Sequence, residues 1–527
     1  MTGFRSSWQW SLLALGMLVA YSSAARILVT LPMPWKSHHF VYHGVMRELA
    51  ARGHEIDYLA AVPMKNQPPN IKHLPLKDDL EEQLGRIAPE EIVQDWQTVV
   101  HYKFNENVLK AIEPIYSQAP EVKKLLESDT KYDIVMSEFH LYQDISLAWV
   151  HKFKALAVCL MVLGDVSHSN EMNGLPDNPS YMIDFLSSFS DEMSIYDRLY
   201  NTAERITSSL VQAYFAWIHQ NMADKFMRYP GWETRPPLSE LASDMALVLV
   251  NSHPAVSYST PKSPHVKEIG GMTLTGSIEL PKDLKSFMDS ATDGVIFFNL
   301  GTNVNLGHVT RDGKLEELLK MFRSLKQKVI IKWTGDNMPH VLDDKIQILA
   351  WVPQLGILAH KNTKLFITHG GLQGTMETVH YGVPIVGIPI FADQPKNVKF
   401  MVMKGCGVQI DKRNITSAAL EWAINEVISN PKYKEAIMKR SAMIRDSLVR
   451  PVDEAVYWIE YVLKHGKVLQ PASVHLPFYK LYLLDVLAIY GAILLFIVSL
   501  MKWLVKSAVR LLCSGSSPKS RKFIKRD

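Results

Sequence analysis

The chain has 527 residues, of which 47% are hydrophobic and 21% are charged, and its formal net charge at pH 7 is +4. This length exceeds that of one ordinary domain, and this composition excludes a largely disordered protein. Three cysteines exclude a small disulfide-stapled scaffold, and the lack of a Cys-x-x-Cys pair argues against a zinc ribbon.

The N-terminus has the pattern of a secretory signal peptide. Arg5 precedes an apolar run over residues 8–20, and small residues follow at 22–25. This pattern predicts a signal peptide over residues 1–25, with cleavage after Ala25. The alternative is a membrane anchor, but the apolar run is shorter than the roughly 20 residues that a span needs.

Residues 26–280 are predicted to form a first Rossmann-like domain. An apolar run, a helical pattern that ends at Gly53 and a second apolar run open this domain. The succession of strand, helix and strand is the usual start of a doubly wound parallel sheet. We expect buried strands at residues 26–31, 56–60, 132–136 and 155–163.

Methionine and aromatic residues at helical spacing run through residues 181–230. They can line an apolar pocket, or they can be ordinary helix faces packed on a core. The residues concerned are Met182, Phe185, Phe189, Met193, Tyr196 and Tyr200.

Residues 281–450 are predicted to form a second Rossmann-like domain, because apolar runs and amphipathic helical patterns alternate there. Two such domains that face each other place a cleft between the carboxyl ends of their sheets, where ligands bind. We expect strands at residues 294–300, 328–333, 346–350, 364–368 and 384–389.

Residues 451–480 are expected to form a returning helix and a linker, and residues 481–501 a transmembrane helix. The second segment holds a single charged residue, Asp485, and is long enough to cross a bilayer. Lys502 and Trp503 at its end are typical interface anchors. The alternative is a helix buried in a protein core.

Residues 502–527 form a basic tail with eight Lys or Arg residues and one Asp. The positive-inside rule places this tail in the cytosol and the main body in the lumen, as in a single-pass type I membrane protein. The tail can contact anionic membrane lipid. Because the basic excess lies outside the folded part, the overall charge does not indicate a nucleic-acid partner.

Three short signals concern modification and residence. Asn414 starts the only N-glycosylation sequon, and Cys513 beside the membrane can be palmitoylated or remain a free thiol. Lys525 stands third from the end, where a dilysine retrieval signal has a lysine, but Phe523 and Ile524 precede it. The match to a signal for the endoplasmic reticulum is therefore incomplete.

Residues 351–397 carry most of the polar candidates for a binding site. His369, Gly370 and Gly371 lie where a strand gives way to a helix, so the backbone can approach an anion that the helix N-terminus attracts. Glu377, about two helical turns later, can bind the diol of a ribose. Trp351 offers a flat face for a base.

Two further positions complete this stretch. Gln354 offers donors and acceptors three residues after the tryptophan. Asp393 and Gln394 follow another strand end and can hold sugar hydroxyls. Each residue alone is a weak signal, but together they provide for a base, a ribose, a diphosphate and a sugar.

The stretch resembles the donor-binding signature of the membrane-bound UDP-glycosyltransferases of animals. Its pattern is W-x-P-Q, H-G-G, E, G-x-P and D-Q, and the resemblance extends along nearly the whole chain. It implies an α/β fold of the GT-B type, with two facing Rossmann-like domains and one C-terminal transmembrane helix. It also implies a UDP-sugar as co-substrate, with neither a cofactor nor a metal.

The resemblance assigns roles position by position. Trp351 would stack on uracil, Gln354 would bond its edge, and Glu377 would hold the ribose. Gln373 stands where Ser or Asn is common, and Thr302 stands where Ser is usual. The diphosphate would be contacted by Thr302, His369, Gly371, Gln373 and Gly374, and the transferred sugar by Asp393 and Gln394.

The resemblance also implies a catalytic base in the first domain. The family's histidine follows a serine and lies 16 residues before the His of an Arg-Gly-His triplet, which selects His38 over His39. A neutral imidazole can take a proton from an acceptor hydroxyl, and an acid should orient it. Glu138 holds the family position of that acid, where vertebrate relatives carry Asp. Asp144 is a second candidate.

The implied reaction is a direct displacement that inverts the anomeric centre. Asn251 stands where glucuronate-using relatives carry Arg, which favours glucose as the transferred sugar. A small lipophilic alcohol or phenol is the expected acceptor, and the endoplasmic reticulum membrane is the expected location. Self-association into a homo-oligomer is left open. The competing hypothesis is a membrane-anchored binding protein of the same fold that has lost catalysis.

Overall fold

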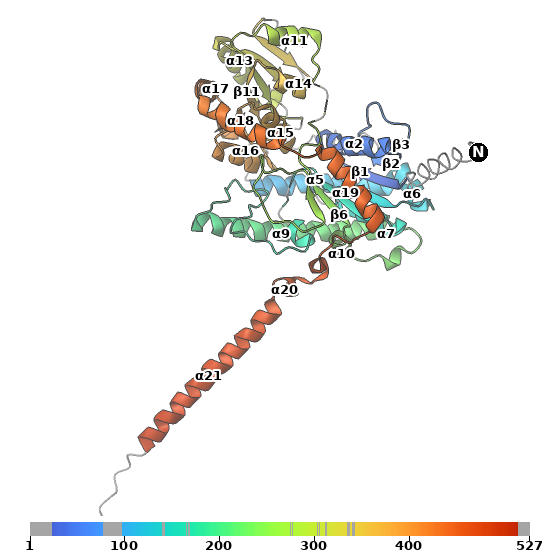
Figure 1. The fold of residues 1–527 in the computed structure, drawn as a ribbon, viewed down its shortest axis with the longest axis vertical. Helices are drawn as coiled ribbons and strands as arrows, with labels where there is room; N and C mark the ends of the chain where they lie inside the picture. Colours follow the sequence, from blue (N-terminus) through green and yellow to red (C-terminus); the bar gives the residue numbers. More distant parts are fainter. Residues whose placement is uncertain are drawn as a thin grey trace, which may run out of the picture.

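The computed structural model contains two α/β domains and a long C-terminal helix that extends away from them (Figure 1). The predicted signal peptide over residues 1–25 lies almost entirely outside the described residues. These are residues 24–76, 97–139, 143–164, 166, 169–274, 276, 278–302, 304, 306–310, 313–334, 338–339 and 343–514.

The first domain is built on a seven-stranded, fully parallel sheet in the order β3-β2-β1-β4-β5-β6-β7. Its strand order reverses between β1 and β4, and such a switch point is where ligands bind in open α/β sheets. The strands are β1 Arg26–Leu31, β2 Glu55–Ala60, β3 Ile71–Pro75, β4 Ile134–Ser137, β5 Leu156–Met161, β6 Leu247–Val250 and β7 Val266–Glu268.

Helices cover both faces of this sheet, because successive strand residues point to opposite sides. Ile27 and Val29 face the apolar layer under α2, whereas Leu28 faces the layer under α5, α7 and α9. The elements are α2 Lys36–Ala51, α5 Gln97–Gln118, α6 Pro120–Glu127, η1 Asp144–Ser146, α7 Leu147–Phe153, α8 Ser169–Met172, α9 Ile195–Phe226, η2 Trp232–Thr234 and α10 Leu238–Ser243.

The second domain repeats the arrangement with a six-stranded parallel sheet in the order β10-β9-β8-β11-β12-β13. Its strands are β8 Val295–Asn299, β9 Lys328–Lys332, β10 Ile346–Leu349, β11 Thr363–Thr368, β12 Ile385–Gly387 and β13 Gly407–Gln409. Its helical elements are α11 Lys282–Asp289, α12 Leu306–Val309, α13 Lys314–Ser324, α14 Gln354–Ala359, α15 Leu372–Tyr381, α16 Gln394–Met403, η3 Lys412–Asn414, α17 Ser417–Ser429 and α18 Pro431–Arg445.

An apolar cluster joins the two domains. Ala255 and Tyr258 of the first domain pack with Met376 and Phe400 of the second. The rings of Tyr258 and Phe400 meet edge to face with their centroids 4.9 Å apart. This contact holds the carboxyl edges of the two sheets toward each other.

The chain then returns to the first domain, as the sequence predicts. Helix α19, Pro451–His465, packs beside α2 and buries Val456 and Ile459 in the same apolar layer (Figure 1). Arg52 beyond α2 donates to Glu460 on α19 at 2.9 Å. The elements η4 Ala472–His475 and α20 Phe478–Leu481 follow.

Helix α21, Leu484–Ser514, is the one helix in the described residues that is long and apolar enough to cross a membrane. The most apolar 18-residue window of this helix has a mean hydropathy of 2.4, and none of that window is buried in the protein. A helix in a protein core is therefore excluded. The helix continues well beyond the predicted end at residue 501.

Candidate active site

Two buried side chains meet at the switch point of the first sheet. His38 lies in the first turn of α2, after β1, and Glu138 directly follows β4. Because β1 and β4 are neighbouring parallel strands, both residues come to the same edge of the sheet. Nδ1 of His38 lies 2.6 Å from Oε2 of Glu138, so the imidazole donates a short hydrogen bond to the carboxylate.

The Glu138 carboxylate is held by further donors. Its side chain is fully buried, and it accepts hydrogen bonds from Nε2 of Gln143 at 3.1 Å and from the backbone N–H of Val162 at 3.3 Å. A buried carboxylate with several donors keeps a fixed position. The orientation of the His38 ring is fixed with it.

Asp144, the second candidate for the acid, has a different partner. Its Oδ2 lies 2.8 Å from Nδ1 of His219 on α9, in the layer on the other side of the sheet. The structure thus brings Glu138, and not Asp144, into contact with His38.

His39 is a buried structural neighbour of the candidate base. Its Nε2 lies 2.7 Å from the carbonyl oxygen of Met33, and its Nδ1 contacts the hydroxyl of Tyr58. Burial lowers the pKa of His39 to about 3, so the ring is neutral at physiological pH. These bonds fix the first turn of α2, which carries His38.

Asp393 of the second domain lies close enough to His38 for the two side chains to interact electrostatically. It stands at the start of α16, where its Oδ2 accepts from the N–H of Leu372 at 3.0 Å and from Asn397 at 2.6 Å. Burial raises the pKa of Asp393 to about 6, and the nearby His38 acts in the opposite direction. Gln394 is anchored too, since its Oε1 accepts from two backbone N–H groups of the preceding loop.

The turn between β11 and α15 needs its glycines. Gly370 has φ +81°, and a Cβ there would lie 2.2 Å from Cγ2 of Val398. A Cβ on Gly371, the N-cap of α15, would lie 2.8 Å from Nε2 of His369. The backbone of this turn and the helix N-terminus can therefore approach an anion closely.

His369 beside this turn is neutral. Burial lowers its pKa to about 4, and the charge of Lys332 acts in the same direction. A neutral imidazole can donate one hydrogen bond to a phosphate oxygen without adding a charge.

A chain of amide side chains runs from β8 to Glu377 on α15. Asn299 donates to Oε1 of Gln354 at 2.6 Å, and Gln354 donates to Oε2 of Glu377 at 2.6 Å. Gln373 donates to the other oxygen of Glu377 at 3.2 Å. A Cβ on Gly374 would lie 3.6 Å from Nε2 of Gln354, so this glycine borders the same group. Burial raises the pKa of Glu377 to about 7.

Lys332 is a site residue that the sequence reasoning missed. It ends β9 and donates to the carbonyl oxygen of Gly301 at 3.2 Å. Its Nζ lies 5.9 Å from the ring centroid of Trp351, whose side chain is 61% exposed after β10. Burial lowers the pKa of Lys332 to about 8. The sequence did contain a signal for it, because Lys332 is a charged residue at the carboxyl end of an apolar strand, where site residues gather in parallel sheets. Thr302 lies exposed after β8 on the same edge.

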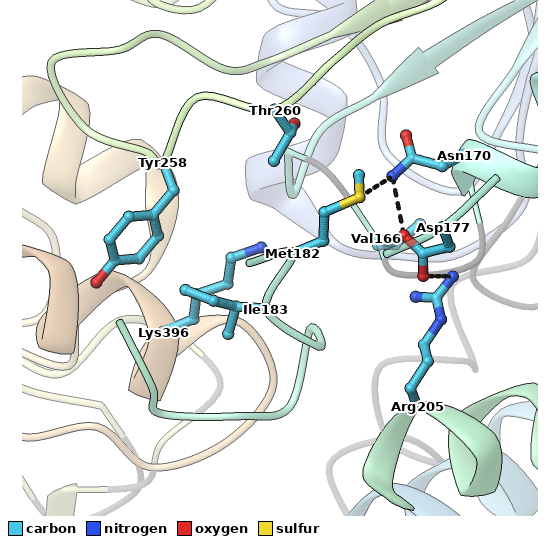
Figure 2. Close-up of a pocket in the computed structure, with 9 residues that line it drawn as sticks. All are labelled: Val166, Asn170, Asp177, Met182, Ile183, Arg205, Tyr258, Thr260 and Lys396. Atoms are coloured by element: carbon cyan, nitrogen blue, oxygen red, sulfur yellow. Dashed lines mark hydrogen bonds and ion pairs between the residues drawn. The ribbon is translucent and has the colours of Figure 1, made fainter. Parts of the chain in front are cut away.

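A small pocket lies between the domains next to this edge (Figure 2). Asn170 and Met182 line it from the first domain, and Lys396 on α16 lines it from the second. Asp177 and Arg205 form a buried ion pair in its wall, and burial raises the pKa of Asp177. The full lining is Val166, Asn170, Asp177, Met182, Ile183, Arg205, Tyr258, Thr260 and Lys396.

The six aromatic and methionine residues of the middle region have four different environments. Met182 lines the pocket, and Phe185 is buried in the core of the first domain. Phe189 and Met193 pack against the cluster that joins the domains. Tyr196 and Tyr200 are exposed on α9. The pocket interpretation applies to Met182. The interpretation as helix faces packed on a core was wrong, because Phe185, Phe189 and Met193 precede α9, which begins at Ile195, and the two tyrosines on α9 are exposed.

Comparison with known proteins identifies the family. The family model described as "UDP-glucoronosyl and UDP-glucosyl transferase" matches residues 25–515. The chain belongs to the UDP-glycosyltransferase family. It is 30% identical to UDP-glycosyltransferase UGT5 of Dactylopius coccus, over 97% of this chain and 98% of that protein. It is 29% identical to UDP-glucuronosyltransferase 2B33 of Macaca mulatta, over 86% and 87% of the two chains.

Solved structures confirm the predicted GT-B fold of this UDP-glycosyltransferase. A UDP-glucosyltransferase from Polygonum tinctorium aligns with a TM-score of 0.55 at 15% identity, over 84% of this chain and 99% of that one. The spinosyn forosaminyltransferase SpnP aligns with a TM-score of 0.54 at 16% identity, over 84% and 100%. At this low identity the likeness concerns the fold alone.

The raised pKa of Glu377 gives a testable pH dependence. Its carboxyl group is ionised in the folded protein only above about pH 7, and the ionised form is the better acceptor for ribose hydroxyls. We expect UDP-glucose to bind more weakly at pH 6 than at pH 8, as measured by calorimetry on the full chain in detergent. Glu377→Gln should remove this difference.

The same shift affects stability. The folded-state pKa lies above the unfolded value, so the stability linked to Glu377 is fully present below the unfolded pKa and is lost as the pH rises through about 7. Glu377→Gln should therefore raise the melting temperature at pH 8 relative to the unsubstituted chain more than at pH 5. The control Glu435→Gln changes an exposed carboxylate on α18. It should change neither the pH dependence of UDP-glucose binding nor the difference in melting temperature between pH 5 and pH 8. A wild-type affinity that does not change with pH would contradict this role.

Proposed function

We propose that the protein transfers a hexose, glucose by preference, from a UDP-sugar to a hydroxyl of a small lipophilic acceptor, with inversion at the anomeric carbon. The observation that carries this proposal is the 2.6 Å contact between His38 and Glu138. This pair lies at the switch point of one sheet, within electrostatic range of Asp393 in the other domain.

The base acts through the second nitrogen of its ring. Nδ1 of His38 donates to Glu138, so in the neutral ring Nε2 carries the lone pair that accepts the proton of the acceptor hydroxyl. The acceptor oxygen attacks the anomeric carbon as the bond to the UDP oxygen breaks and leaves both electrons on UDP. Glu138 stabilises the imidazolium that forms. One displacement converts an α-linked donor into a β-glycoside.

The second domain supplies the groups that bind the donor. Trp351 presents an exposed ring for stacking on the base, and Glu377 holds the ribose. The N-terminus of α15 and neutral His369 stabilise the charge that develops on the leaving diphosphate. Thr302, Gln373 and Gly374 border the same edge, and Asp393 and Gln394 hold the sugar hydroxyls.

The preference for glucose is supported by Asn251. This residue follows β6, is buried and neutral, and has both ends of its amide occupied within the first domain. Its Nδ2 donates to the carbonyl oxygen of Val162 at 3.0 Å, and its Oδ1 accepts from the N–H of Gly271 at 3.4 Å. A cation that binds the carboxylate of glucuronate would have to lie at the sugar end of the donor. Lys332 instead contacts Trp351, which is assigned to the base end of the donor.

The pocket of Figure 2 is proposed to receive the acceptor. It lies between the first domain and α16, the helix that begins at Gln394. Its lining combines apolar side chains such as Ile183 with polar ones such as Asn170, which suits a lipophilic molecule that carries a hydroxyl group.

The cellular setting stays part of the proposal. We infer a cleaved signal peptide, a luminal catalytic part and residence in the endoplasmic reticulum membrane, with α21 as the single span. Asn414 is exposed at the end of η3, so a glycan could be attached there. The competing hypothesis of an inactive binding protein rests on Glu138 in place of Asp, and the 2.6 Å contact of Glu138 with His38 supports the enzyme over that hypothesis.

The donor preference can be tested on membranes that contain the full chain. UDP-glucose and UDP-glucuronate are compared with a panel of phenols and lipophilic alcohols, and we expect the higher kcat/KM with UDP-glucose. A higher value with UDP-glucuronate would contradict the donor assignment. Binding of both donors without transfer to any acceptor would favour the binding protein.

The base and its acid can be tested with three variants. His38→Ala should lower kcat by about 10²- to 10⁴-fold, the range for general base catalysis, and leave the affinity for UDP unchanged. Glu138→Gln should lower kcat in the same way, because the amide cannot stabilise the imidazolium. Asp144→Asn is the matched control and should keep most of the activity. Loss of activity in Asp144→Asn with full activity in Glu138→Gln would reverse the assignment of the acid.

A further inference from the structure

Helix α9 carries an exposed apolar stripe that neither the fold nor the active site uses. Its residues, here named the outer stripe, recur at intervals of three, four or seven positions and so share one face of the helix. Leu210 near its centre is 68% exposed. The outer stripe consists of Tyr196, Leu199, Ile206, Leu210, Tyr214 and Trp217.

The outer stripe is a second apolar face of the helix. The opposite face is the one that packs on the protein, where Arg205, Phe215 and His219 are buried. From residue 206 to residue 222 the helix contains no Asp, Glu, Lys or Arg. A contiguous exposed apolar surface of this kind marks an interaction site.

The position of α9 is tied to the start of the membrane helix. Tyr482, two residues before α21, accepts from the backbone N–H of Asp177 at 3.0 Å and donates to Glu171 at 2.6 Å. Asp177 is in turn paired with Arg205 on α9. The root of the span and the buried face of α9 are therefore bound to one segment.

Further contacts fix α9 to the same segment. Asn201 on α9 donates to the carbonyl oxygen of Met182 at 2.9 Å, and its own Oδ1 accepts from the N–H of Asp184 at 2.9 Å. In Figure 1, α9 lies on the side of the globular part from which α20 and α21 leave. These contacts keep α9 on the side of the protein that is nearest to a bilayer crossed by α21.

We infer that the outer stripe rests on the membrane, with its aliphatic side chains at the boundary between headgroups and acyl chains. Tyrosine and tryptophan are the residues that favour this interface, because an apolar ring and a polar group share one side chain. The protein is then held to lipid at two places, by α21 and by α9. The inference depends on α21 as the span and is independent of the reaction.

The spacing of the outer stripe also suits a helix of a second copy, as in a coiled coil. The bilayer is favoured because the hydrogen bonds of Tyr482 fix α9 beside the anchor, whereas nothing in the described residues places a second copy there.

The test uses the full chain with Cys513→Ser, since Cys159 and Cys406 are buried and do not react readily with a thiol label. A nitroxide is attached at Leu210→Cys, and in a matched control at Trp422→Cys on α17, where the side chain is 58% exposed on the second domain. The protein is reconstituted in phosphatidylcholine nanodiscs. Spin relaxation by oxygen, which partitions into lipid, is compared with relaxation by a water-soluble nickel chelate.

We expect the label at residue 210 to collide more with oxygen than with nickel, and the label at residue 422 to show the reverse. A label at residue 199, in Leu199→Cys, should behave as the label at residue 210. Nickel accessibility at residue 210 equal to that at residue 422 would overturn the inference. Dipolar broadening between labels at residue 210, seen only in discs with two copies, would assign the stripe to a second copy instead. Unchanged binding of UDP by each variant shows that it is folded.

Discussion

The hydrogen bond between His38 and Glu138 is the constraint on which the rest of the site depends. It can form only because β1 and β4 are adjacent parallel strands, so that residues 107 positions apart in β1 and β4 lie side by side. The carboxylate is buried and held by three donors, and the first turn of α2 is fixed by His39. This packing determines that Nδ1, and not Nε2, is the ring nitrogen of His38 that contacts Glu138.

The second requirement is that the two domains stay face to face. The edge-to-face contact of Tyr258 with Phe400 joins the two domains directly, and the packing of α19 on α2 returns the chain from the second domain to the first. Burial of the site residues has chemical consequences. It keeps His369 neutral and raises the pKa of Asp393 and Glu377, so that each group depends on its partners for the protonation state it needs.

Buried parallel strands were predictable, because they are continuous apolar runs bounded by turns. The edge strands β3, β7 and β13 were not, because they are short or carry polar residues such as Lys72 and His73. The donor residues could be assigned from a resemblance in one contiguous stretch. The choice between Glu138 and Asp144, and the presence of Lys332 beside Trp351, depended on which strand ends meet in space. Which strand ends lie next to each other is set by the order of strands in the sheet, and the local sequence does not specify that order.

The most direct test of the central claim is the configuration of the product. An acceptor activated by His38 and a UDP-sugar bound at Asp393 should react in one displacement from opposite faces of the sugar ring. Proton NMR of the glucoside formed from UDP-glucose reports the coupling between H1 and H2 of the sugar. The large coupling of a β-glucoside is the predicted result, and the small coupling of an α-glucoside would contradict a single displacement.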